Sequence, residues 1–147
     1  MLLGEFQYII DEKGRIFIPA KFREELGAEV VVSKGFDDCL FIHSIPEFEK
    51  FTEEIDNMDM IEQRNVIRFF YGASSNLKLD KQGRINIPQT LRDYAGLTKD
   101  IVVIGANRRA EVWDKEKWDA INSSELTSQS ILKVMQAAKK NARGSGI

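Results

Sequence analysis

The feature that most constrains this chain is a nine-residue motif that occurs twice. Residues 11–19 read Asp-Glu-Lys-Gly-Arg-Ile-Phe-Ile-Pro, and residues 80–88, 69 positions later, read Asp-Lys-Gln-Gly-Arg-Ile-Asn-Ile-Pro. The similarity continues beyond the motif, and the matched pairs include Arg23 with Arg92, Gly27 with Gly96, and Phe48 with Trp118. Self-similarity of this extent predicts two copies of one small unit, packed by pseudo-twofold symmetry. Because each half of a 147-residue chain would be marginally stable alone, we expect the halves to share one core.

Each motif begins with the residues of a tight turn. An aspartate at the first position of a type I turn can bond its own backbone, and a glycine at the fourth accepts the left-handed conformation that commonly closes a β-hairpin. We therefore expect Asp11 and Gly14, with their counterparts Asp80 and Gly83, to shape two hairpin turns. The arginine that follows each glycine should emerge at the mouth of its hairpin.

The remaining pattern predicts a mixed α/β (α+β) fold. Apolar runs and alternation predict strands over 6–10, 30–33, 40–43, 77–79, 101–104 and 110–113, and a proline that suits a first helical turn precedes each of two short helices, over 20–26 and 89–95. Ser44 and Glu47 form a capping box that opens a further helix. We divide the chain into a first repeat (1–57), a linker helix (58–72), a second repeat (73–122) and a C-terminal helix with a basic tail (123–147).

The charge of the chain is polarised along the sequence. The net charge of −2 alone argues against a nucleic-acid partner, but residues 37–62 hold nine acids and one base, whereas residues 131–147 hold four bases and no acid. A local basic face therefore remains possible. The C-terminal segment also carries an apolar stripe of Ile131, Leu132, Met135, Ala138 and Ala142, which we interpret as core or as a subunit interface.

The sequence offers no site for chemistry. With one cysteine and one histidine, Cys39 and His43, the chain lacks the ligands of an ordinary zinc site, and we interpret both as structural. It shows no phosphate-binding glycine loop and no nucleophile motif, so we expect no enzyme activity, metal or cofactor. No apolar run approaches the ~20 residues of a membrane span, and no signal peptide is visible, so we expect a cytoplasmic protein.

Two explanations fit the motif arginines, Arg15 and Arg84, when only the residues are considered. A guanidinium can bind a guanine edge or a phosphate, and a hairpin would present it to a groove of DNA. Alternatively, each arginine forms an ion pair with the aspartate four residues before it, and this pair only stabilises the turn.

The two Asp-x-x-x-Arg motifs, each followed by Ile-x-Ile-Pro, resemble those of the MraZ family of bacterial transcription regulators, and the resemblance covers nearly the whole chain. One such hairpin would indicate only the wider AbrB-like superfamily. The resemblance implies two AbrB-like swapped-hairpin repeats that form a barrel-like fold and assemble into closed homo-oligomeric rings. It also implies binding to direct repeats in double-stranded promoter DNA and repression of the division and cell-wall gene cluster that includes the family's own gene.

In the family the motif arginines contact DNA, which here implies Arg15 and Arg84. Lys13, Lys21 and Lys81 are further candidates for DNA contact, although for any single lysine an ordinary solvent-exposed position is the better explanation. Gln82 occupies the position that Lys13 has in the first repeat, so the two halves need not bind DNA with equal affinity.

Two other functions are compatible with parts of the sequence. AbrB-like hairpins also occur in DNA-binding antitoxins that act mainly through a protein partner, although this chain has no long disordered tail of the kind that neutralises a toxin. A small-molecule enzyme would need convergent polar groups, and only Glu53, Asp56 and Asp59 are weak candidates. Their position on acidic, solvent-exposed helix faces is the simpler explanation of these residues.

Overall fold

A computed structural model describes residues 1–145. Gly146 and Ile147, the end of the expected basic tail, lie outside this range. Residues 1–114 form one compact unit and the residues from Lys115 onward form a second. Each unit is described by itself.

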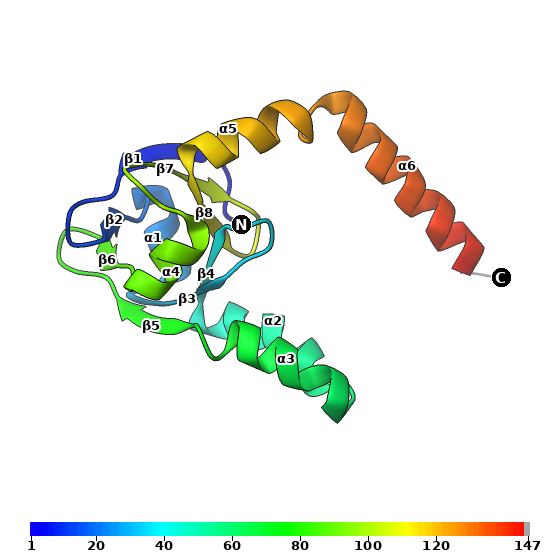
Figure 1. The fold of residues 1–147 in the computed structure, drawn as a ribbon, viewed down its shortest axis with the longest axis horizontal. Helices are drawn as coiled ribbons and strands as arrows, with labels where there is room; N and C mark the ends of the chain where they lie inside the picture. Colours follow the sequence, from blue (N-terminus) through cyan, green and yellow to red (C-terminus); the bar gives the residue numbers. More distant parts are fainter. Residues whose placement is uncertain (146–147) are drawn as a thin grey trace. The chain divides into compact units, whose positions relative to one another are not determined.

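The first unit contains both repeats, and their elements follow one another in the same order (Figure 1). The first repeat comprises β1 (Glu5–Ile9), β2 (Arg15–Phe17), α1 (Ala20–Leu26), β3 (Glu29–Lys34) and β4 (Leu40–Ser44). The second comprises β5 (Ser75–Lys78), β6 (Arg84–Asn86), α4 (Gln89–Ala95), β7 (Asp100–Gly105) and β8 (Ala110–Asp114). Between them lie α2 (Ile45–Asp56) and α3 (Met60–Phe70). The prediction of a mixed α/β fold built from two similar repeats is confirmed.

The main sheet exchanges strands between the repeats. Its order is β1-β7-β8-β4-β3-β5, and every neighbouring pair is antiparallel. The first strand of each repeat lies at an edge and pairs with the other repeat, because β1 pairs with β7 and β5 pairs with β3. The order is unchanged when the repeats are interchanged, as pseudo-twofold symmetry requires. The swapped arrangement implied by the family resemblance is therefore the one observed.

The turns predicted from the motifs are present, but the strands that flank each turn do not pair with each other. Strands β2 and β6 form a separate two-stranded antiparallel ribbon, in which Arg15 lies opposite Asn86, Ile16 opposite Ile85, and Phe17 opposite Arg84. If β1 and β2 paired with each other as a local hairpin, they would lose their pairing with β7 and β6 of the other repeat. Each turn therefore connects an edge of the main sheet to the ribbon, which corrects the simple hairpin interpretation.

Both repeats contribute to one hydrophobic core. Ile16 and Ile85, the central pair of the ribbon, are almost completely buried, as are Phe22 on α1 and Leu91 on α4. Each of these positions in the first repeat has its counterpart in the second, so neither half could bury its apolar residues without the other. The expectation of a shared core is confirmed.

Both helices between the repeats have a side-chain cap at the N-terminus, and α2 begins where the sequence predicts. The Ser44 side chain accepts a hydrogen bond of 3.3 Å from the Glu47 backbone N–H, which caps α2, and Asp59 caps α3 by accepting from the Ile61 backbone N–H. On α2 the side chains of Phe48, Thr52 and Ile55 are buried. These helices place an acidic segment beside the main sheet.

The second unit consists of α5 (Lys115–Ser124) and α6 (Ser128–Ser145). On α6 the side chains of Ile131, Leu132, Val134 and Met135 are all exposed. Among the described residues no helix is long and apolar enough to cross a membrane.

We predict that the ribbon isoleucines hold the two repeats together. Replacing Ile85 by Ala should lower the free energy of unfolding by about 2–5 kcal/mol, because it opens a cavity in a fully packed core. Urea denaturation followed by circular dichroism measures this, and a single transition is expected because the core is shared. Thr90→Ala, an exposed change nearby on α4, is the matched control and should change stability by less than about 0.5 kcal/mol. Equal effects of the two substitutions would contradict this account of the core.

Candidate nucleic-acid interface

The two motif turns have the same hydrogen-bond pattern. The Asp11 carbonyl accepts from the Gly14 N–H at 3.0 Å, while Asp11 Oδ1 accepts from the backbone N–H groups of Lys13 (3.0 Å) and Arg15 (2.8 Å). Asp80 repeats each bond with Gly83, Gln82 and Arg84. Gly14 and Gly83 have φ of 85° and 80°, which a residue with a side chain rarely adopts. The aspartates and glycines therefore take the turn-shaping positions expected of them.

Each motif arginine is held at one nitrogen only. Arg15 Nε donates to Asp11 Oδ2 at 2.6 Å, and Arg84 Nε donates to Asp80 Oδ2 at 2.9 Å. Within the described chain, the terminal nitrogens of both guanidinium groups have no hydrogen-bond partner. The intrachain pair and the capacity for an external contact therefore coexist, since the aspartate fixes the near side of the guanidinium and leaves its outer edge available.

The ribbon brings the two arginines onto one face. Side chains alternate along a strand, and because Ile16 and Ile85 point into the core, Arg15 and Arg84 must point outward. Phe17 and Asn86, two residues after the arginines, share this outer face, and both are exposed. The Arg84 guanidinium carbon lies 5.9 Å from the centre of the Phe17 ring. Sequence reasoning missed Phe17 and Asn86, although counting two residues on from each arginine would have found them.

Arg23 and Arg92 support the turns from the opposite repeat. Arg23 Nε donates to the Ile18 carbonyl at 3.0 Å, and Arg92 Nε donates to the Ile87 carbonyl at 2.9 Å. A Cβ placed on Gly14 would lie 2.6 Å from Arg92 Nε, so this guanidinium packs directly on the first turn. The sequence identified these two arginines only as a matched pair of the repeats. The structure gives both arginines a carbonyl partner within their own repeat and a packing contact with the other.

The three candidate lysines are exposed but are not equivalent. Lys13 is the third residue of its turn, whereas Lys81 is the second residue of the other turn, and Lys21 lies on α1. Glu12 stands beside Lys13, while Gln82 stands beside Lys81. The second turn is therefore less acidic than the first, and this difference follows from side-chain charge alone.

Hydrogen bonding keeps both turn aspartates ionised. The backbone N–H of Arg15 contributes most to lowering the pKa of Asp11 below its ordinary value of 3.8, with a smaller contribution from the Arg15 side chain. Asp80 has the same causes in the same order, through Arg84. Each arginine thus lies beside a carboxylate that carries its charge throughout the physiological pH range.

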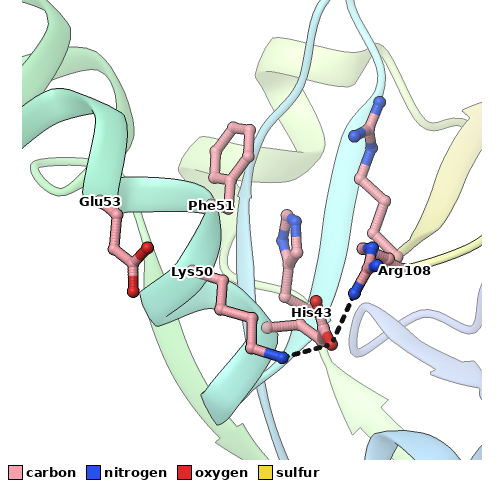
Figure 2. A pocket seen from close by; sticks show the side chains of 7 residues that line it. His43, Lys50, Phe51, Glu53 and Arg108 are labelled. Carbon is pink, nitrogen blue, oxygen red and sulfur yellow. Dashed lines mark ion pairs between the residues drawn. The ribbon is translucent and has the colours of Figure 1, made fainter.

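A separate pocket of about 390 Å³ lies between α2 and the turn that joins β7 to β8, and it includes none of the motif residues (Figure 2). His43 and Phe51 line it, and the Glu47 carboxylate lies 3.6 Å from both Lys50 Nζ and Arg108 Nη1. The imidazole of His43 is stacked on Phe51, with ring centroids 4.9 Å apart. Burial, together with the positive charge of Arg109, lowers the pKa of His43 to about 4, so it is neutral at physiological pH.

Cys39 and His43 both lie in or beside β4, where both are buried. Cys39 Sγ donates to the Phe36 carbonyl, and burial raises the pKa of the thiol, so it stays protonated. Among residues 1–145, no group of three or more His, Cys, Asp or Glu side chains is arranged to hold a metal ion.

Comparison with known proteins gives a consistent result over nearly the whole chain. The family model described as "MraZ protein, putative antitoxin-like" matches residues 1–68 and again residues 69–141. A protein of Acetivibrio thermocellus named "Transcriptional regulator MraZ" is 43% identical over 138 residues, which cover 92% of this chain and 96% of that protein. Proteins of the same name from Natranaerobius thermophilus (45% over 121 residues, 81% and 85% covered) and Syntrophomonas wolfei (42% over 130 residues, 87% and 91% covered) are also similar.

We predict that the backbone N–H of Arg15 lowers the pKa of Asp11 even when the guanidinium is absent. In Arg15→Gln the pKa of Asp11 should rise part of the way toward 3.8, because the backbone hydrogen bond that lowers it most remains. Carboxyl-carbon NMR titration measures the shift, and Asp80 in the same sample is the internal control. A full return of the Asp11 pKa to its ordinary value would contradict this ranking of causes.

A second prediction concerns His43 and acid. Its pKa is lower in the folded chain than the ordinary 6.5, so the unfolded chain binds the proton more readily, and stability falls as pH drops from 6.5 toward 4. Between pH 7 and pH 5 the loss from this group should be about 2 kcal/mol. His43→Phe keeps a ring against Phe51 but cannot titrate, so its stability should vary less over this range in urea denaturation. An unchanged pH dependence would exclude His43 as the cause.

Proposed function

This chain belongs to the MraZ family of transcriptional regulators, and we propose that it acts by binding double-stranded DNA through the outer face of the β2–β6 ribbon. The family is one of regulators rather than enzymes. The observation that carries the proposal is the placement of Arg15 and Arg84 on one exposed face. Each has its near side fixed by an aspartate, and its terminal nitrogens have no partner among residues 1–145.

The shape of the ribbon suits the major groove. That groove is about 12 Å wide and admits a two-stranded β-ribbon. In the observed register Arg15 and Arg84 are diagonal neighbours, a geometry that separates Cα atoms by about 7–8 Å. The two guanidinium groups therefore form one composite reading surface, rather than two independent hairpins, and they can reach bases or phosphates about two steps apart.

The other residues of this face have complementary roles in the proposal. Asn86 carries an amide that can bind adenine through two hydrogen bonds, whereas Phe17 offers an apolar surface to a thymine methyl group. The exposed Lys13, Lys81 and Lys21 contribute phosphate contacts, which add affinity but no sequence preference. Because the two repeats differ at all of these positions, the reading surface is only approximately symmetric.

We further propose that several copies assemble into a closed ring that binds direct repeats in promoter DNA. One acidic subunit with a single small ribbon makes few phosphate contacts, and linked subunits gain avidity without new contacts. As the family resemblance implies, the target is the division and cell-wall gene cluster that includes the protein's own gene, the usual outcome is repression, and the protein is cytoplasmic and nucleoid-associated.

We predict that the two motif arginines dominate sequence-specific binding. Arg15→Ala and Arg84→Ala should each weaken binding to the upstream fragment by about 1–3 kcal/mol, or roughly 5- to 150-fold. Fluorescence anisotropy with the chain's own upstream fragment and a scrambled copy, measured across salt concentrations, provides the comparison. Lys13→Ala should instead weaken binding to both fragments alike and reduce the salt slope by about 0.9.

Arg108→Ala provides a matched control, because Arg108 is an exposed arginine on the β7–β8 turn, away from the ribbon. It should leave binding unchanged. If the Arg15 and Arg84 double variant bound the repeats as tightly as the unmodified chain, the proposed surface would be wrong. No preference of the unmodified chain for its upstream fragment would contradict direct operator binding and favour an antitoxin-like role through a protein partner.

A further inference from the structure

An apolar groove lies on α3, and none of its lining residues belongs to the motif turns. It has a volume of about 510 Å³ and is lined by Phe36, Asn65, Val66, Phe69 and Phe70. Phe70 is buried, while Phe36, in the turn between β3 and β4, is 58% exposed. An exposed aromatic side chain beside a cavity with almost no polar lining is typical of a binding surface.

The floor of this groove is held in place by ring packing. Phe70 makes edge-to-face contacts with Phe36, Phe51 and Phe69, at centroid distances of 5.8, 5.1 and 4.9 Å. Phe36 in turn packs edge-to-face on Phe41 of β4. The groove is therefore a preformed surface anchored to the main sheet, and a ligand would not have to order it on binding.

Acidic side chains border the groove. Asp37 and Asp38 directly follow Phe36, and Glu62 lies one helical turn before Val66, which places it on the same side of α3. All three are exposed. The border is not uniformly acidic.

Two bases also lie beside the groove, because Lys34 Nζ is 5.4 Å from the centre of the Phe69 ring and Arg68 donates to Asn65 Oδ1 at 3.0 Å. The partner that fits this groove should therefore have an apolar centre, with positive charge on the side of Glu62.

The described part of α6 has these properties. Ile131, Met135 and Ala138 recur at helical spacing along one side, flanked by Leu132 and Val134. The exposed fractions of Ile131, Leu132 and Met135 are 40%, 56% and 64%. Lys139 lies on the Leu132 side of this stripe, and the segment from 131 onward contains no acid. Amphipathic helices commonly bind apolar grooves through side chains at positions i, i+4 and i+7.

We propose that the apolar stripe of α6 in one copy of the chain binds the α3 groove of a second copy, with Lys139 facing Glu62. The proposal rests on the assembly of several copies suggested above and identifies its interface. Because stripe and groove are different surfaces, the contact is head-to-tail, and each copy retains one free stripe and one free groove for the next copy. Repetition of such a contact produces a ring when the rotation between copies closes.

The stripe can be tested with a pair of substitutions on the same helix. Met135→Glu places a charge in the proposed interface and should raise the concentration at which the assembly dissociates at least about tenfold. Gln136→Glu adds the same charge one residue later, toward the opposite side of α6, and should leave the mass unchanged. Size-exclusion chromatography with light scattering over a dilution series measures both, and circular dichroism verifies that α6 is intact.

A charge exchange tests the orientation of the contact. Glu62→Lys and Lys139→Glu should each weaken the assembly, and the double variant should restore most of the loss, because the two charges again attract. Both side chains are exposed, so folding should be preserved. A double variant as weak as the sum of the single variants, or a Met135→Glu chain that assembles like Gln136→Glu, would overturn the proposed interface while leaving assembly itself intact.

Assembly and DNA binding can fail separately. An unmodified chain that is monomeric at all concentrations would contradict both this interface and the proposed ring. The Met135→Glu chain keeps its ribbon, so it should still prefer its upstream fragment to the scrambled one but should lose the gain from linked subunits. Complete loss of that preference would show that the substitution acts on the reading surface and not on assembly, and would also count against the proposal.

Discussion

The reciprocal bonding of the two repeats at the β2–β6 ribbon is the constraint on which the rest of the structure depends. The Gly14 carbonyl accepts from the Ile87 N–H, and the Gly83 carbonyl accepts from the Ile18 N–H, so each turn is held by the strand that follows the other turn. Beneath them Ile16 and Ile85 meet in the core. Neither turn could keep its position in an isolated repeat, because the partner of its glycine carbonyl belongs to the other half of the chain.

The residues that the two copies of the motif share divide between folding and presentation of the arginine. The aspartate accepts backbone and guanidinium hydrogen bonds, and the glycine supplies a positive φ. Within the described residues, Nε is the only guanidinium nitrogen of each arginine that bonds to the turn. A charge-assisted bond at Nε orients the planar guanidinium, so its outer edge needs little further ordering when it meets a partner. The stabilising pair and the proposed contact are thus two functions of one side chain.

Much of the fold follows from local signals. Turn residues, capping residues and apolar periodicity predicted the short helices after Pro19 and Pro88 with correct bounds, and the strands within one or two residues. The pairing of those strands was less accessible. A tight turn between two strands favours a hairpin, and only the exchange of edge strands between repeats separates β1 from β2. Strand alternation alone puts Phe17 on the side of Arg15 and Asn86 on the side of Arg84, but only the pairing of β2 with β6 brings all four side chains onto one face.

The sequence by itself determined that the chain is a duplicated unit with two turns, each followed by an arginine, and that no constellation for chemistry accompanies them. These features depend on residues close together in the chain, whose conformational preferences act locally. Only the tertiary structure decided that both arginines belong to one surface, that Arg23 and Arg92 support the turns, and that an apolar groove opens on α3. Those outcomes depend on contacts between residues tens of positions apart, and such contacts are fixed by packing of the whole core rather than by any local preference.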